Sequence, residues 1–151
     1  MVTIRSDDFT RRDKVALKTA DETVNNTTTL QADDALLVAL GANETWILRY
    51  FIKFNSNATA NFKYSYTVPS GTTYSSLLQG QNSGGTDVHY FRTSGAQDVD
   101  GEAADWAVTA VAVVKTGSTA GNFVLTWAQN TANASDTKVL IGSNIVAHRL
   151  A

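Results

Sequence analysis

The sequence predicts an all-β protein, an antiparallel β-sandwich or jelly-roll-like barrel with an extended N-terminal arm. Apolar and polar residues alternate through 44–54 and 60–68, which is the two-residue period of a half-buried strand. A helix would scatter these aromatic side chains around its circumference. Shorter segments at 36–40 and 122–128 repeat the pattern between turn residues. About seven to nine strands are expected, enough for a sandwich, jelly roll or related barrel.

Segments 44–54 and 60–68 are expected to be adjacent antiparallel strands joined through the polar turn 55–59. They should place four aromatic or aliphatic side chains in one core: Trp46, Leu48, Tyr64 and Tyr66.

Two further strands are predicted toward the C-terminus. Residues 106–116 are nearly all apolar and rich in valine, which is typical of a central strand buried on both faces. Segments 138–141 and 144–150 flank Gly142-Ser143, a pair that favours a hairpin turn.

The predicted domain organisation has three parts. Residues 1–35 lack sustained periodicity and are expected to form the extended arm, with one short strand near 15–17. Residues 36–151 should form a single β domain. Within it, residues 69–105 are rich in Ser, Gly, Thr and Asp and are expected to be a long irregular contact region.

Composition excludes several classes of function. The chain has 151 residues, 43% hydrophobic and 17% charged, with a net charge of -2 and no cysteine. Disulfides and thiolate metal sites are excluded, and without a basic excess we expect no nucleic-acid partner. No apolar run approaches a membrane span and no secretory signal is visible, so we expect no membrane partner and synthesis in the cytoplasm.

Catalytic patterns are missing, so we predict that the protein is not an enzyme and uses no cofactor or metal. His89 and His148 each lack a second histidine at ligand spacing. Ser118 lies in a Gly-Ser-Thr-Ala-Gly run, which is not the nucleophile elbow. One acidic group leaves cation binding open, although a solvated loop is the favoured interpretation: Asp98, Asp100, Glu102 and Asp105.

Candidate contact residues fall in two places. Three aromatic residues in the irregular region are expected to form a contact loop: Tyr74, Tyr90 and Phe91. The arm holds five of the twelve Lys and Arg residues between positions 1 and 20. Its docking residues, toward a neighbouring subunit or a larger assembly, are expected to be Val2, Ile4, Arg5, Phe9, Arg11 and Arg12. Trp46 and Trp127 share the inward face of the pattern and favour core packing over sugar stacking.

Several short runs resemble phage structural proteins. The resemblance covers roughly residues 18–72 and rests on Lys18-Thr19-Ala20-Asp21-Glu22, Thr29-Leu30-Gln31-Ala32-Asp33-Asp34, Leu36-x-Val38-x-Leu40, Ala42-Asn43-Glu44-Thr45-Trp46, and Phe62-Lys63 followed by Val68-Pro69-Ser70-Gly71-Thr72. These proteins include capsid decoration (auxiliary or cement) proteins and domains of tail appendages. The resemblance implies a jelly-roll-like homotrimer on the capsid exterior of a virion, with the major capsid protein as partner.

Two other functions remain open on sequence grounds. One is a tail-fibre or receptor-binding domain that binds carbohydrate through residues 69–105. The other is a hydrolase on a β scaffold, for which the sequence offers no converging carboxylate or histidine cleft. The lack of any shaft or heptad repeat favours the decoration protein over a fibre.

Overall fold

Our computed structural model describes residues 13–81, 87–92, 96–99, 101 and 104–151, and these residues form an all-β protein. The described residues form no helix with the length and apolar character needed to cross a membrane. The strands are β1 (Asp13–Leu17), β2 (Glu22–Val24), β3 (Gln31–Leu40), β4 (Thr45–Ser56), β5 (Phe62–Thr67), β6 (Thr73–Gln81), β7 (Asp87–Arg92), β8 (Gln97–Val99), β9 (Ala104–Lys115), β10 (Gly121–Gln129), β11 (Thr137–Val139) and β12 (Asn144–Arg149).

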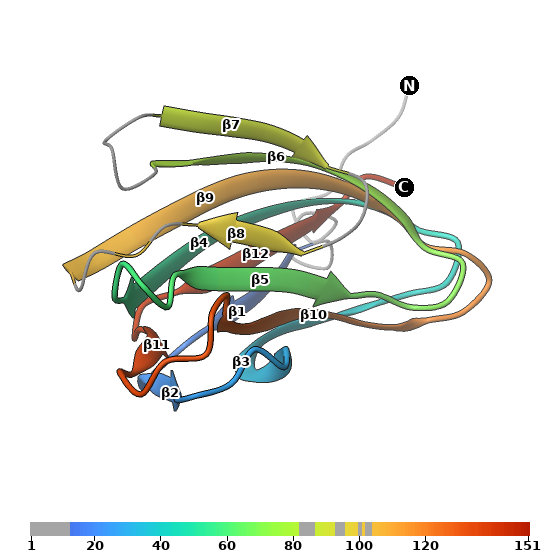
Figure 1. Ribbon diagram of the computed structural model, residues 1–151. Helices are drawn as coiled ribbons and strands as arrows, with labels where there is room; N and C mark the ends of the chain where they lie inside the picture. The colour runs from blue at the N-terminus through green and yellow to red at the C-terminus, as the bar shows by residue number, and fades with distance from the viewer. Residues whose placement is uncertain (1–12, 82–86, 93–95, 100, 102–103) are drawn as a thin grey trace, which may run out of the picture.

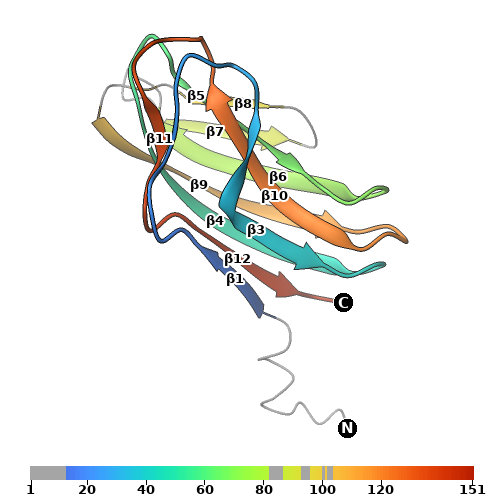
Figure 2. The same ribbon diagram turned by 90° about the horizontal axis from the view of Figure 1, so that it is seen from below.

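Two antiparallel sheets face each other in a sandwich, which confirms the predicted fold class (Figure 1). The large sheet has the order β1-β12-β4-β9-β6-β7, and β11 joins it by pairing with β4 and β2. The small sheet has the order β3-β10-β5-β8. Figure 2 shows β3, β10 and β5 lying across β12, β4, β9 and β6, with β1 and β7 at opposite edges of the large sheet.

The core lies between the two sheets and is rich in aromatic rings. Trp46, Leu48 and Tyr64 are buried as predicted, and Tyr66 packs half-buried against them. Trp127 is fully buried, which confirms its predicted inward orientation on β10. The strand alternation visible in the sequence therefore identifies the inner side chains correctly.

The predicted pairing of segments 44–54 and 60–68 is wrong. β4 pairs with β9, β12 and β11 in the large sheet, whereas β5 pairs with β10 and β8 in the small sheet. The two strands contribute to the same core from opposite sides, as in the stacked rings of Phe54 and Phe62, whose centroids are 4.5 Å apart. Alternation reports which side chains face the core, but two facing strands produce the same pattern as two adjacent strands.

The predicted arm is corrected from residue 13 onward. Residues 13–17 form β1, which pairs along its whole length with β12, and Ala16 is buried. Val24 of β2 also belongs to the core, and β3 begins inside the predicted arm at Gln31. These strands are short or partly polar, so they give little periodicity to read. Residues 1–12 lie outside the described residues.

The region 69–105 is corrected in the same way, because it contains β6, β7 and β8. β6 pairs with β9 on one side and with β7 on the other. Its sequence, Thr-Tyr-Ser-Ser-Leu-Leu-Gln-Gly-Gln, is polar on both faces. Backbone hydrogen bonds hold such a strand between its neighbours without the hydrophobic alternation that would reveal it.

Two predictions about the C-terminal half also change. β11 and β12 do not form a hairpin, because both pair with the same side of β4, in succession. Gly142 and Ser143 instead lie in a short connection between β11 and β12. There the Ser143 hydroxyl accepts a hydrogen bond from the Lys53 N–H at 2.9 Å. β9 is internal in its sheet, but only one of its faces is buried, as its burial pattern alternates.

Candidate functional site

The outer face of the large sheet, on the side away from the small sheet, carries an unusual number of exposed apolar side chains. On β9, Val111 is 41% exposed and Val113 is 47% exposed, while Phe51 of β4 is 37% exposed. Further members come from β1, β6 and β12: Val15, Leu17, Leu77 and Val146. We call these seven residues the outer apolar face. Single exposed apolar residues are ordinary, but a contiguous patch marks an interaction site.

The strand register makes this patch continuous. Val15 pairs with Val146, and Val146 pairs with Arg49. Arg49 in turn pairs with Val111, which pairs with Leu77. One row of side chains therefore crosses five neighbouring strands, and four of its five members are apolar.

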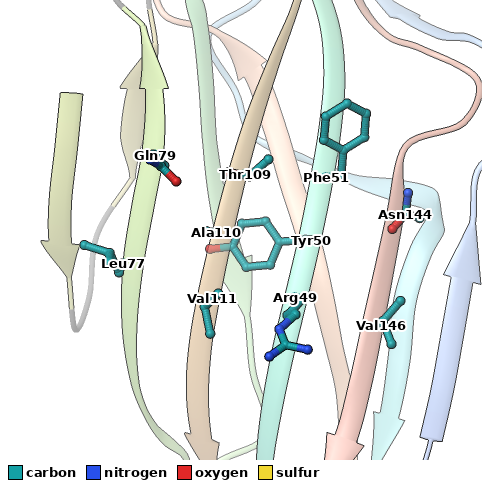
Figure 3. A pocket seen from close by; sticks show the side chains of 10 residues that line it. All are labelled: Arg49, Tyr50, Phe51, Leu77, Gln79, Thr109, Ala110, Val111, Asn144 and Val146. Carbon is teal, nitrogen blue, oxygen red and sulfur yellow. The ribbon is translucent and has the colours of Figure 1, made fainter. Parts of the chain in front are cut away.

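A shallow groove of about 420 Å³ lies on this face between β12 and β6 (Figure 3). It is lined by Arg49, Tyr50, Phe51, Leu77, Gln79, Thr109, Ala110, Val111, Asn144 and Val146. Figure 3 shows Arg49 and Phe51 on the same strand, with Asn144 on one side and Gln79 on the other. The groove thus combines an apolar surface with a few polar side chains.

Arg49 is the cation at the centre of this face. It is exposed, and within the described part of the chain it has no carboxylate partner. At one corner of the face, His148 of β12 forms an ion pair with Asp13 of β1 when protonated. His148 therefore lies partly exposed on β12, one strand in from the edge strand β1.

The predicted contact residues are distributed differently. Tyr74 lies on β6 and is half-buried, with its ring edge-on to Tyr66 at a centroid distance of 5.9 Å. It belongs to the core margin, which corrects its assignment to a contact loop. Tyr90 and Phe91 lie on the edge strand β7, opposite Leu78 and Leu77, but their side chains are outside the described residues.

The six arm residues, Val2, Ile4, Arg5, Phe9, Arg11 and Arg12, all lie outside the described residues. Of the acidic group at 98–105, Asp105 is exposed and accepts a hydrogen bond from the Asn55 amide at 2.9 Å. The side chains of Asp98, Asp100 and Glu102 are outside the described residues, as is that of His89.

A second site, which the sequence analysis missed, surrounds the buried side chain of Lys18. The Lys18 ammonium lies 2.6 Å from Glu22, 3.0 Å from Asp33 and 2.6 Å from Asp34. Lys18 is 1% exposed and the Asp33 side chain is fully buried. We call these four residues the Lys18 cluster.

The three carboxylates converge closely enough to suit a metal ion, but the Lys18 ammonium supplies the positive charge at their centre. Two of the carboxylates are also held by other groups. Asp33 accepts hydrogen bonds from the N–H groups of Ala35 and Leu36 and from the Trp127 indole. Glu22 accepts one from the Gln31 amide at 2.6 Å.

The environment shifts the pKa values of the cluster in different directions. Burial by itself would lower the pKa of Lys18, but hydrogen bonds to Asp34, Glu22 and Asp33 outweigh it and raise that pKa. Burial raises the pKa of Glu22 despite its bond to Lys18. The contact with Lys18 lowers the pKa of the more exposed Asp34. Lys18 therefore carries a full charge at neutral pH, opposed by carboxylates of unequal acidity.

The buried tyrosines form a structural group. The hydroxyls of Tyr66 and Tyr50 are hydrogen-bonded to each other, and burial raises the pKa of Tyr50 to about 12. Both rings therefore stay neutral at physiological pH and pack as core residues.

No protein-family model and no curated protein matches this sequence. Solved structures with a similar chain path include the CBM22-1–GH10 modules of a Clostridium thermocellum xylanase complexed with xylohexaose, at 12% identity and a TM-score of 0.40. They also include the VP2 subviral particle of infectious bursal disease virus, at 9% identity and a TM-score of 0.27. The alignments cover 93% and 91% of this chain, but only 29% and 40% of those chains. At these values the likeness assigns neither a family nor a function.

Proposed function

We propose that this chain is a virion structural protein of a bacteriophage, a capsid decoration protein that binds the outer capsid surface as a homo-oligomer and stabilises the mature lattice. The observation that carries the proposal is the outer apolar face. Val15, Val146, Val111 and Leu77 form a row across five strands with no covering element among the described residues. The free energy falls when a partner binds such a surface and removes it from water.

The arrangement suits assembly better than catalysis. The described carboxylates that converge do so around Lys18, where the ammonium occupies the space between them. The outer apolar face, in contrast, is open and spans five paired strands of the large sheet. A capsid offers many copies of one site, so an oligomer gains avidity from several weak contacts.

The resemblance of residues 18–72 to phage structural proteins supports the same proposal. It implies a homotrimer and a major capsid protein as the partner. Residues 1–12 join the domain at β1, an edge strand that contributes Val15 and Leu17 to the outer apolar face. We therefore keep Val2, Ile4 and Phe9, with Arg5, Arg11 and Arg12, as the proposed docking residues of the arm.

The test compares two lysine substitutions at apolar positions of similar exposure. Val111→Lys places a second charge beside Arg49 on the outer apolar face. Leu37→Lys, at a residue that is 38% exposed on the small sheet, is the matched control. Sedimentation of the full chain should show an oligomer, most simply a trimer, and co-sedimentation with capsids of the encoding phage should show binding.

We expect Val111→Lys to weaken self-association or capsid binding by tenfold or more, and Leu37→Lys to leave both near the wild-type value. A wild-type chain that stays monomeric and never binds capsids would contradict the proposal. Equal effects of the two substitutions would show that the outer apolar face is not the contact surface.

A receptor-binding or carbohydrate-binding domain is the second candidate, and one observation favours it. Arg49, Gln79 and Asn144 place polar groups around Phe51 in the groove, and an aromatic ring with convergent polar groups is a common way to bind a small polar ligand. Binding on a glycan array that Phe51→Ala abolishes would support this function. Glycan binding without any capsid binding would replace the decoration proposal.

A further inference from the structure

Lys18 and Asp33 form a buried contact between the two sheets. Lys18 directly follows β1 of the large sheet, and Asp33 belongs to β3 of the small sheet. The Lys18 Nζ lies 3.0 Å from Asp33 Oδ1, and both side chains are 1% exposed or less. An amine and a carboxyl group held this close, with water excluded, are positioned as two reactants of an intramolecular reaction.

The Asp33 carboxylate is held in a fixed orientation. Its Oδ1 atom accepts hydrogen bonds from the N–H groups of Ala35 at 3.0 Å and Leu36 at 2.8 Å. Its Oδ2 atom accepts one from the Trp127 indole N–H at 3.1 Å. Two N–H groups directed at one oxygen stabilise negative charge on that atom, as they do when a tetrahedral intermediate forms at a carbonyl carbon.

Glu22 is placed to move protons within this group. Its Oε2 atom lies 2.6 Å from Lys18 Nζ, and the Gln31 amide fixes its other oxygen. The pKa of Glu22 is raised by burial, so its carboxylate accepts a proton more readily than an exposed one. Asp34 lies equally close to Nζ at 2.6 Å, but its side chain is 73% exposed.

We propose that Lys18 Nζ and Asp33 Cγ condense to form an isopeptide bond. The ammonium transfers a proton to Glu22, and Glu22 passes it to Asp33 Oδ2. The freed amine then attacks Cγ of the neutral Asp33 carboxyl group. The negative charge then develops on Oδ1, against the N–H groups of Ala35 and Leu36. Asp33 Oδ2 leaves as water with two of the three ammonium protons, one of them passed on by Glu22, and the third proton stays on the new amide. No other reactant is needed.

The ion pair seen in the structure is the state before this reaction. A charged amine is not a nucleophile and a carboxylate is not an electrophile, so condensation proceeds only through the small fraction in which the proton has moved from Lys18 through Glu22 to Asp33. A slow single turnover is sufficient, because the water that leaves does not return to a buried site. The product ties the two sheets together covalently in a chain that has no cysteine. The proposal does not rest on the function proposed above.

The direct test is the mass of the purified full chain after denaturation. We expect a mass lower than the sequence mass by one water molecule. Proteolysis after Glu22 and Glu44 should then release the segment ending at Glu22 and the segment 23–44 as one branched species joined through Lys18 and Asp33. An aspartyl succinimide has the same mass loss, but it leaves the two segments separate.

A full sequence mass for the folded wild-type chain would overturn the proposal. So would a branched species joined through Asp34. Two separate segments of which one has lost water, as a Lys18–Glu22 link or a succinimide would give, would also overturn it. Each result is read on the wild-type protein, so none depends on whether a variant folds.

Two variants test the assigned role of Glu22. Glu22→Gln keeps the size of the side chain but removes the proton acceptor, and we expect the cross-linked fraction to fall at least tenfold. Asp34→Asn is the matched control at the same distance from Nζ, and it should keep the wild-type fraction. A Glu22→Gln chain that folds, by circular dichroism, and cross-links fully would overturn the proton-transfer role.

Discussion

The two faces of β9 have similar sequences and opposite environments. Its inner face carries Val108, Ala110 and Val114, none more than 5% exposed. Its outer face carries Val111 and Val113, which are 41% and 47% exposed. Composition alone does not distinguish them, and this is why the sequence predicted a strand buried on both sides.

The difference lies in what covers each face. The small sheet covers the inner face, whereas no described element covers the outer one. Valine on the exposed side of an internal strand is expected when a partner molecule covers that side. The inner face therefore determines whether the chain folds, and the outer face is available for association.

The largest expected difference separates two phenylalanines on β4. Phe54 faces inward, is fully buried and stacks on Phe62, whereas Phe51 lies on the outer apolar face. Phe54→Ala should lower the free energy of unfolding by about 3–5 kcal/mol, and Phe51→Ala by less than about 1 kcal/mol. Urea unfolding of both variants measures this, and similar losses would show that the outer face is also part of the folded core.

The next prediction concerns the Lys18 cluster. Lys18→Met removes the ammonium, and with it the proposed cross-link, and leaves the buried Asp33 carboxylate without a partner cation, so we expect a loss of about 3 kcal/mol or more. Lys115→Met is the control, because Lys115 is exposed at the end of β9, and it should change stability by less than about 0.5 kcal/mol. Chemical denaturation at neutral pH measures both, and a wild-type stability for Lys18→Met would show that the cluster contributes nothing to stability.

A smaller effect is expected at Glu44. Burial by itself would raise its pKa, but hydrogen bonds from Arg149, the Gly41 N–H and the Trp46 indole outweigh it and lower that pKa. A lowered pKa in the folded state stabilises the protein above the pKa of the unfolded chain, near 4.3 for glutamate, and this stabilisation is lost as pH falls through the folded-state value.

We therefore expect Glu44→Gln to be about 1 kcal/mol less stable than wild type at pH 7. The gap should narrow as the pH falls from about 5 to 3. Denaturant titrations at several pH values measure it. A constant gap across this range would mean that the Glu44 charge is not involved.

The fold class could be predicted because strand alternation is a local property of the sequence. Phe123, Leu125 and Trp127 of β10 are inward and fully buried, as the alternation indicated. Pairing could not be predicted, because β4 and β5 share a core without sharing a sheet. Nor could β6, whose polar side chains hide a strand that backbone hydrogen bonds define.

The candidate sites were less accessible to sequence reasoning for two reasons. The outer apolar face joins residues from five strands, and only the register places Val15 and Leu77 in the same row of side chains. The Lys18 cluster brings together Lys18 and Asp33, which are 15 positions apart in the sequence. Its members Lys18, Glu22, Asp33 and Asp34 all occur in the runs that carry the resemblance to phage proteins. Their shared occurrence in these runs was the available signal in the sequence, and net charge alone does not reveal it.

The smallest effect on stability is expected from polar replacement on the outer face of β9. In the double variant Val111→Thr, Val113→Thr, threonine keeps the β-branched shape that suits a strand, and both side chains already contact water. We expect the free energy of unfolding to change by less than about 0.5 kcal/mol, while self-association or capsid binding weakens because the partner gains less apolar contact.

The matched inner variant Val114→Thr buries a hydroxyl at a position that is fully buried and should lose about 1–3 kcal/mol. Urea unfolding and sedimentation, run on the same samples, separate the two effects. A double variant that unfolds more easily, yet associates like wild type, would mean that Val111 and Val113 serve the fold itself and that the partner binds elsewhere.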